Sequence, residues 1–350
     1  YGVCNGHRAV QENLMNTHNI IGQSRLVGRM DRILSDGRIV HAYLFTGPAG
    51  SGKKTLSSLF AQALICEGPG ERPCGVCSTC RQFQTGNHPD VMWIRRQEGR
   101  KNILIEQIRD MQEKMKVKPF QAGSRICFIE SAQVMTEQAQ NALLKTLEEP
   151  PSHSVFFLLA DNTFSILPTI RSRCQMVRIG SLPREDVAGI LTERLNLPRE
   201  KARTYAALSQ GIPGKALSLA EDASFRDNRK RLVEGLSMAG SSRILELYDV
   251  FQDHREQVDD LLDILILWFR DLLVYKETGD PDRIINLDQT DLLRKQASLF
   301  TIRDLNDMME KVEESRKILK GNGNYQLTIE NMLLHFQGGS HHAANRRNPV

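Results

Sequence analysis

The chain contains the stretch Gly47-Pro48-Ala49-Gly50-Ser51-Gly52-Lys53-Lys54-Thr55. Its spacing is that of a phosphate-binding Walker A loop, in which glycines turn backbone N–H groups onto phosphate oxygens, a lysine neutralises the outer phosphates and a Ser or Thr hydroxyl binds Mg²⁺. Gly47, Gly52 and Lys53 fit this pattern. Lys54 occupies the hydroxyl position, where a second cation would repel the metal, and Thr55 could replace it only if the loop shifted. We therefore predict a loop with an intact frame and a compromised metal position.

The segments on either side of the loop have the pattern that a P-loop requires. Residues 40–46 are typical of a buried strand that enters the loop, and residues 55–64 of an amphipathic helix that leaves it. The alternative is a glycine-rich turn that matches the motif by chance, but such a turn would not need a strand before it and a helix after it. The loop residues expected to contact a nucleotide are Gly47, Gly50, Gly52, Lys53 and Thr55.

A second strand, residues 125–129, ends at Glu130 and Ser131. P-loop ATPases use two acids at such a position, the first to hold Mg²⁺ and the second to polarise the attacking water. Glu130 can do the first job, but the Ser131 hydroxyl is a poor proton acceptor at neutral pH. The alternative is an ordinary core strand with a polar end. Two positions that ATP hydrolysis requires therefore carry unsuitable residues. Both changes should weaken hydrolysis more than they weaken phosphate binding.

Composition places the chain among ordinary globular proteins. Its 350 residues suffice for two or three domains, and a net charge of +4 permits contact with nucleic acid without requiring it. The most apolar stretch, residues 261–269, contains Asp263 and is far shorter than the roughly 20 residues that span a bilayer. Residues 1–14 are polar and lack the apolar core of a secretion signal. We expect a cytoplasmic protein with no membrane partner.

Four of the seven cysteines lie close together in the sequence, at Cys66, Cys74, Cys77 and Cys80. Without a secretion signal disulfides are disfavoured, and two C-x-x-C steps that share Cys77 present thiolates at metal-ligand spacing. Zinc is the leading interpretation. An iron–sulfur cluster of the ferredoxin type would have a further cysteine and proline after the run, and free thiols are the remaining alternative. His88 is a candidate substitute ligand, although its His-Pro-Asp segment is more typical of a turn.

The pattern of elements divides the chain in two. Strand and helix patterns alternate up to about residue 180, which predicts an open α/β sheet, and strand patterns are absent from Pro183 onward. The predicted regions are an N-terminal extension (1–14), an α/β domain (15–180) with the cysteine insertion at 66–80, a small helical domain (181–224), a larger helical domain (225–336) and a disordered tail (337–350).

Two further motifs carry a family resemblance. Residues 139–151 read AQNALLKTLEEPP and residues 167–174 read LPTIRSRC, and together with the P-loop, the cysteines and His88-Pro89-Asp90 they resemble the bacterial clamp-loader subunits of DNA polymerase III, which are AAA+ proteins. The likeness covers residues 15–220 and extends more loosely to 336. These motifs in this order are specific.

The resemblance implies a fold and a set of partners. The fold is an α/β P-loop AAA+ module, a parallel sheet flanked by helices, followed by a helical lid (181–224) and an all-α collar (225–336). The implied partners are the other clamp-loader subunits of a five-membered ring, the sliding clamp that the ring opens, and the primed DNA on which the clamp is placed during replication.

The altered positions select a type within this family. Motor subunits carry Thr after the P-loop lysine and Asp-Glu at the second strand, so Lys54 and Glu130-Ser131 resemble the delta-prime type, a fixed partner more than a motor. The Ser-Arg-Cys motif implies that Arg173 is an arginine finger that reaches the ATP of a neighbouring subunit, since its planar charged fork stabilises phosphoryl transfer. A solvated surface charge is the alternative for Arg173. The resemblance also implies that Lys215 lies at a second sensor position and Asn162 near the first.

Three functions follow from these interpretations. The first is a clamp-loader subunit that supplies Arg173 in trans, has weak or no ATPase of its own, binds zinc, and holds ATP or ADP weakly or not at all. The second is an active gamma/tau-like motor of the same complex, and the third a zinc-containing adaptor with a relic P-loop. The sequence leaves open whether the chain is itself an enzyme, which subunits flank it, and whether it touches DNA.

Overall fold

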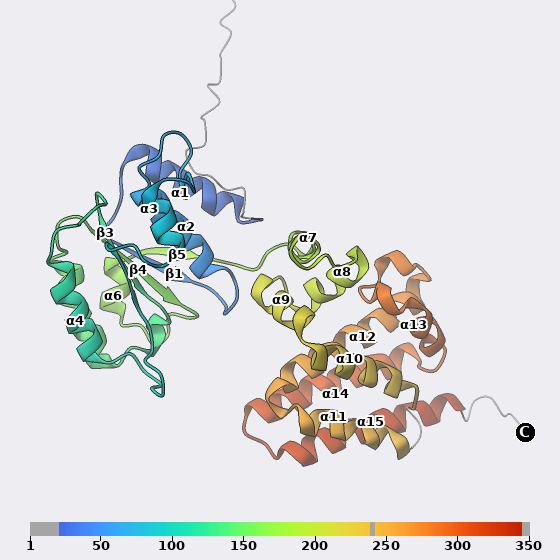
Figure 1. Ribbon diagram of the computed structural model, residues 1–350. Coiled ribbons are helices and arrows are strands. Elements are labelled where there is room, and N and C mark those ends of the chain that lie inside the picture. Colours follow the sequence, from blue (N-terminus) through green and yellow to red (C-terminus); the bar gives the residue numbers. More distant parts are fainter. Residues whose placement is uncertain (1–20, 239–241, 345–350) are drawn as a thin grey trace, which may run out of the picture. The chain divides into compact units, whose positions relative to one another are not determined.

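A computed structural model describes residues 21–238 and 242–344 of the chain (Figure 1). Its contacts divide the chain into two compact units, one ending at Ser181 and the other beginning at Leu182. The sequence places a boundary near residue 180, next to this division. The further separation of 181–224 from 225–336 stays a prediction, and the expected extension at 1–14 lies outside the described residues.

The first unit is built on a five-stranded parallel sheet with the order β2-β3-β4-β1-β5. Leu44 of β1 pairs with Leu158 of β4, and Thr46 at the end of β1 pairs with Ala160. β1, β3 and β4 are almost continuously buried because helices cover both faces, as parallel sheets require. The strands are β1 (Ala42–Thr46), β2 (Val91–Ile94), β3 (Arg125–Ile129), β4 (Ser154–Ala160) and β5 (Gln175–Arg178).

Helices pack on each face of this sheet (Figure 1). Side chains alternate along β1, so Leu44 faces the helices α4 to α6, while Tyr43 and Phe45 face α1 and α2. On the second face the rings of Trp93, Phe128 and Phe157 stack, with centroids 4.0 and 5.0 Å apart. The helices are α1 (Ser24–Asp36), α2 (Lys53–Ile65), α3 (Ser78–Gln84), α4 (Ile105–Met115), α5 (Glu137–Glu148) and α6 (Pro168–Arg173), with a 3₁₀ turn η1 (Ala132–Val134).

The second unit is entirely helical in its described part. The 21-residue α12 is its central element and packs against α13 and α14, and α14 packs against α15. Trp268 of α12 is buried, and its indole N–H donates to Gln296 Oε1 at 2.7 Å. The helices are α7 (Arg184–Leu195), α8 (Arg199–Leu208), α9 (Pro213–Glu221), α10 (Ala223–Gly235), α11 (Tyr248–Asp253), α12 (Val258–Thr278), α13 (Thr290–Ala297), α14 (Ile302–Lys320) and α15 (Tyr325–Ala344).

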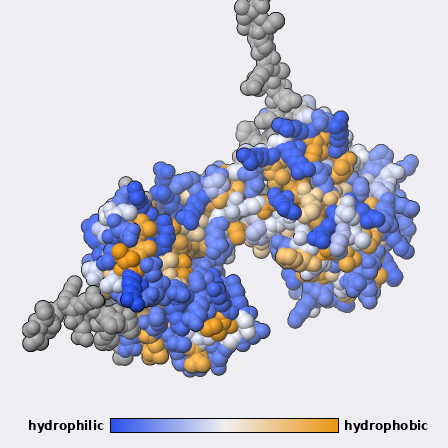
Figure 2. All heavy atoms as spheres, turned by 180° about the vertical axis from the view of Figure 1, so that it is seen from behind, coloured by the Kyte–Doolittle hydropathy of each residue, from blue (hydrophilic) through white to orange (hydrophobic). Residues whose placement is uncertain are grey.

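The surface is mainly hydrophilic, as the composition of an ordinary globular protein predicts. Figure 2 shows small apolar patches scattered among hydrophilic side chains on the face it presents. Within residues 21–238 and 242–344, no helix has both the length and the apolar character needed to cross a bilayer.

The tail prediction is wrong for residues 337–344, because α15 continues to Ala344. Phe336 is buried against Phe269, with ring centroids 5.3 Å apart, which anchors the helix just before the predicted tail. Each further residue adds a backbone hydrogen bond, whereas Gly338 and Gly339 each cost only about 1 kcal/mol relative to alanine. A helix that is already anchored therefore extends through them. Residues 345–350 lie outside the described part of the chain.

The buried carboxylate of Asp90 fixes the start of β2 to the loop that precedes β3. It accepts hydrogen bonds from the backbone N–H groups of Phe120, Gln121 and Ala122 at 2.7, 2.8 and 3.0 Å, and Arg125 lies beside it at 3.4 Å. Burial by itself would raise the pKa of Asp90, but these donors outweigh it and hold the pKa below its usual range.

We expect Asp90→Asn to lower the free energy of unfolding at pH 7 by about 1–3 kcal/mol, because buried N–H donors lose a charged acceptor. The folded-state pKa is depressed below the unfolded value of about 3.9, so the contribution of Asp90 is complete above that pH and is lost as pH falls through the folded-state pKa. Urea unfolding between about pH 7 and pH 3 should show the difference from wild type shrinking at the acid end. A pH-independent difference would contradict this account, and Asp110→Asn on the exposed face of α4 is the control.

Candidate functional site

The loop after β1 keeps the backbone shape of a phosphate cradle. A Cβ atom on Gly47 would lie 2.2 Å from the carbonyl oxygen of Ile179, so only glycine fits there. Gly50 and Gly52 have φ angles of +79° and +91°, in the left-handed region that favours glycine. Gly52 caps α2 without a side chain, which leaves the N–H groups of the first helical turn for an anion. The buried hydroxyl of Ser51 has no hydrogen-bond partner among the described residues.

The P-loop lysine is bound by its own chain. Lys53 Nζ donates to the carbonyl oxygens of Gly47 and Pro48 and to Asp161 Oδ1, each at 2.8 Å. An ammonium group has three N–H donors, so all of them are used. Asp161 directly follows β4, which pairs with β1 and so brings the carboxylate to the loop. The phosphate-binding cation is thus already neutralised by a carboxylate.

The sequence interpretation missed Asp161, which the structure brings into the candidate site. Asn162 was expected near the first sensor, but its Oδ1 accepts a hydrogen bond from the N–H of Phe164 at 3.1 Å. The second oxygen of Asp161 accepts from Gln133 Nε2 at 3.0 Å, so the carboxylate is fixed on both sides. The available signal was an acid immediately after a buried strand that neighbours β1 in a parallel sheet.

The metal position is filled by an ion-pair cluster. Lys54 Nζ lies 3.2 and 3.4 Å from the two oxygens of Glu130, and Arg95 Nε lies 2.9 Å from Oε2. Both cations also lie over the Trp93 ring, at 5.1 and 4.9 Å from its centroid. Glu130, the expected Mg²⁺ ligand, is therefore engaged by two protein cations. Thr55 is exposed on α2.

A cavity of about 440 Å³ opens beside this cluster, at the ends of β2 and β3. Its lining has four cationic side chains and one acidic one, which disfavours a divalent cation and favours anions. The lining residues are Lys54, Arg95, Arg96, Gln97, Arg100, Glu130 and Ser131.

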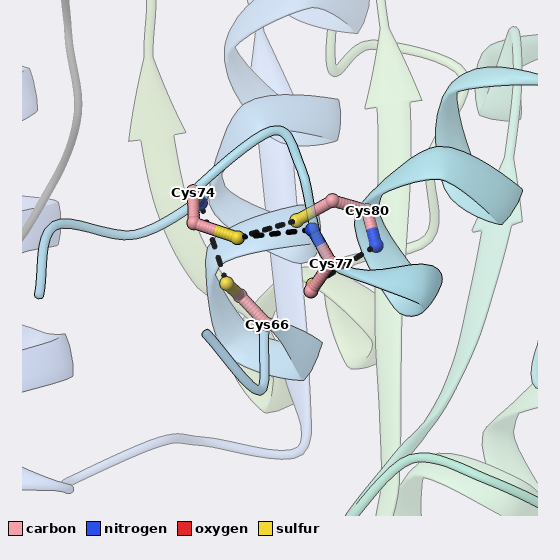
Figure 3. A group of neighbouring side chains, drawn as sticks. All are labelled: Cys66, Cys74, Cys77 and Cys80. Carbon is pink, nitrogen blue, oxygen red and sulfur yellow. Dashed lines mark hydrogen bonds between the residues drawn. The ribbon is translucent and has the colours of Figure 1, made fainter. Parts of the chain in front are cut away.

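The four cysteines converge between the end of α2 and the start of α3 (Figure 3). Their four sulfur atoms lie within 4.8 Å of one another. The N–H of Cys74 points at Cys66 Sγ at 3.3 Å, that of Cys77 at Cys74 Sγ at 3.4 Å, and that of Cys80 at Cys77 Sγ at 3.4 Å. Such donors stabilise thiolates.

His88 does not join this cluster. Its Nδ1 accepts a hydrogen bond from the N–H of Asp90 at 3.1 Å, which is the turn that His-Pro-Asp suggests. Burial lowers the pKa of His88, and this effect outweighs the negative charges of Asp90 and Glu67, which would raise the pKa. The substitute-ligand interpretation is therefore wrong, because His88 is not among the residues whose ligand atoms converge at the cluster.

Arg173 ends α6, where it is partly exposed. Its Nη2 lies 2.7 Å from Glu148 Oε1 at the end of α5, and its Nη1 donates to the carbonyl oxygen of Thr169 at 3.1 Å. The adjacent Ser172 hydroxyl donates to the same carbonyl at 3.0 Å, and Cys174 is buried. The guanidinium is thus oriented by its own helix while part of it faces solvent.

Lys215 belongs to the second unit. Its ammonium lies 2.6 Å from Asp260 Oδ1 and 3.5 Å from Asp263 Oδ2, both on α12, so it joins α9 to that helix. A role at the second sensor stays a prediction.

Comparison with known proteins places the chain. A family model described as DNA polymerase III, delta subunit, matches residues 22–183, and one for the C-terminal part of that subunit matches residues 223–338. The delta-prime subunit of Pseudomonas aeruginosa is 30% identical over 84% of this chain and 90% of its own, and that of Haemophilus influenzae is 34% identical over 64% and 69%. The chain belongs to the DNA polymerase III delta-prime family.

The delta-prime assignment confirms the expected family and the expected fold of a P-loop α/β module with a helical C-terminal region. The tau subunit of Bacillus subtilis is also similar, 27% identical over 93% of this chain, but the chain spans only 62% of the length of tau.

Proposed function

We propose that this delta-prime-type chain is a fixed subunit of a clamp loader that hydrolyses little or no ATP and contributes Arg173 to the ATP site of a neighbouring subunit. Its partners would be the other loader subunits, the sliding clamp and, through the complex, primed DNA. The observation that carries the proposal is the ion pair between Lys54 and Glu130 at the position of the metal.

An active motor is disfavoured by the same geometry. Hydrolysis needs Mg²⁺ to bridge the outer phosphates and an acid to orient water. Here the Glu130 carboxylate is bound to two cations, and Ser131 offers only a hydroxyl. The third function, an adaptor with a relic P-loop, would not use Arg173. Effects of Arg173 on a neighbour's reaction therefore separate it from the proposed one.

We infer that Cys66, Cys74, Cys77 and Cys80 hold a zinc ion. Four thiolates around tetrahedral zinc at about 2.3 Å have their sulfurs about 3.8 Å apart, so the observed separations need only a small contraction. A Cβ atom on Gly68 would lie 2.5 Å from Cys74 Sγ, so the backbone approaches the cluster as closely as glycine allows. Bound zinc would act as a structural cross-link between α2 and α3 in an insertion with few apolar side chains.

The isolated chain should show no steady ATP hydrolysis, because the metal position is filled by Lys54 and no acid orients water. Turnover is measured with Mg²⁺ and ATP, with Lys53→Ala as the control for contaminating ATPases. A rate on the order of 1 per second or faster, lost in Lys53→Ala, would establish a motor and reject the proposal.

Arg173→Ala in a reconstituted loader should lower DNA- and clamp-stimulated ATP turnover in part, with a larger loss of clamp loading. An arginine finger is worth about 10³–10⁵ in rate at one site, and the other sites of the ring keep their own. Arg173→Lys should restore little, since lysine lacks the planar fork.

The control for this experiment is Arg109→Ala, which removes an exposed arginine from α4. Assembly of each complex is checked first by size-exclusion chromatography. Unchanged turnover and loading in a fully assembled Arg173→Ala complex would show that this arginine is a surface charge.

Protein purified without a metal-affinity step should contain one zinc per chain by elemental analysis. Cys77→Ser should lose it, and Gly68→Ala should hold it more weakly, because the added methyl group displaces the Cys74 thiol. Cys127→Ala, whose sulfur is buried in β3 away from the cluster, should keep the metal. Iron with visible absorbance, or no metal in the wild type, would refute the inference.

A further inference from the structure

We propose that the phosphate loop of this chain selects a metal-free nucleoside diphosphate over a Mg²⁺-bound nucleoside triphosphate. Lys54 takes the place of the metal, and the Asp161 carboxylate takes the place of the terminal phosphate. The inference deepens the proposed function and rests on it, since a subunit that does not hydrolyse has no need of the metal or of the third phosphate.

The part of the site that binds the inner phosphates is preserved. The left-handed glycines shape the loop, the uncapped first turn of α2 leaves N–H donors free, and the buried Ser51 hydroxyl within the loop has no partner among the described residues. The Ser51 oxygen is a second, independent sign of a ligand, because a buried hydroxyl without a partner is costly. These features suit a diphosphate.

Lys54 supplies the charge that a metal would otherwise bring. Its ammonium lies within 3.4 Å of both Glu130 oxygens and is held over Trp93, so a divalent cation would have to displace it from both. The other three cations of the adjoining cavity, Arg95, Arg96 and Arg100, further disfavour Mg²⁺ and would neutralise phosphate charge. The loop therefore binds its anion with protein cations alone.

Asp161 opposes the third phosphate. In a P-loop the lysine contacts the β- and γ-phosphates, and here Asp161 Oδ1 occupies one of the three donors of Lys53. Gln133 holds the other carboxylate oxygen, so the side chain cannot swing away without losing a second hydrogen bond. A γ-phosphate at Lys53 would meet a like charge fixed in position, whereas a diphosphate ends before it.

The test is equilibrium binding of ADP and ATP to the full chain by titration calorimetry, in Mg²⁺ and in EDTA. Wild type should bind ADP at least about tenfold more tightly than ATP, and Mg²⁺ should not strengthen ADP binding. Asp161→Asn keeps the shape and removes the charge, so the preference should fall to within about threefold while ADP affinity changes little. Lys54→Thr should make ADP binding depend on Mg²⁺. Asp110→Asn, which removes an exposed carboxylate far along α4, should match wild type.

Three results would overturn the inference. They are tighter binding of Mg²⁺-ATP than of ADP, an unchanged preference in Asp161→Asn, and the absence of saturable binding of either nucleotide up to about 1 mM. Circular dichroism of each variant excludes unfolding as the cause. If the ADP preference is not found, the prediction for Arg173 in the reconstituted loader still stands. If Arg173→Ala has no effect there, the proposed function is rejected, but the measured nucleotide affinities are unchanged.

Discussion

The parallel pairing of β1 with β4 determines which side chains meet at the phosphate loop. Because parallel strands end at the same sheet edge, the residue after Ala160 arrives beside the loop that follows Thr46, and that residue is Asp161. The ion pair with Lys53 follows from this register. A shift by one residue would bring Asn162 to the loop and turn every side chain of β4 to the other face. The charge at the site is thus set by the core packing that fixes the register.

The same sheet also places the cations at the metal position. Trp93 at the end region of β2 stacks on Phe128 of β3, and its ring supports both Lys54 and Arg95. The stacked rings of Trp93 and Phe128 therefore help to position the charged groups of Lys54 and Arg95 and also pack against the core. Glu130 is held between these two cations, where a motor subunit would keep an acid free for Mg²⁺. The position expected to hold Mg²⁺ is thus occupied by a partly exposed ion-pair network, beside a loop that keeps its left-handed glycines.

Lys53 and Arg173 differ in how accessible their charged groups are. The Lys53 side chain is 10% exposed and its ammonium is enclosed by its own chain, whereas the Arg173 side chain is 36% exposed at the end of α6 and contacts Glu148 and the carbonyl oxygen of Thr169. The partner carboxylates are exposed to a similar degree, 43% for Asp161 and 48% for Glu148, so the two sites differ in the burial of the cation. The proposed role of Arg173 in trans requires a cation that is accessible in this way.

Several features were determined by the sequence alone because they depend on residues close together in the chain. The spacing of the glycines, the two C-x-x-C steps and the apolar periodicities specify the loop, the cysteine cluster and the order of strands and helices. Tertiary structure decided what lies opposite each group. Lys53 and Asp161 are 108 positions apart, and Lys54 and Glu130 are 76 apart, so neither pair has a local signal. His88 was a candidate substitute ligand because it lies near the cysteines in the sequence, although a turn was the more typical interpretation of His-Pro-Asp, and in the structure its ring accepts a hydrogen bond from the N–H of Asp90. Sheet order and register, which bury apolar side chains on both faces, fixed these partners.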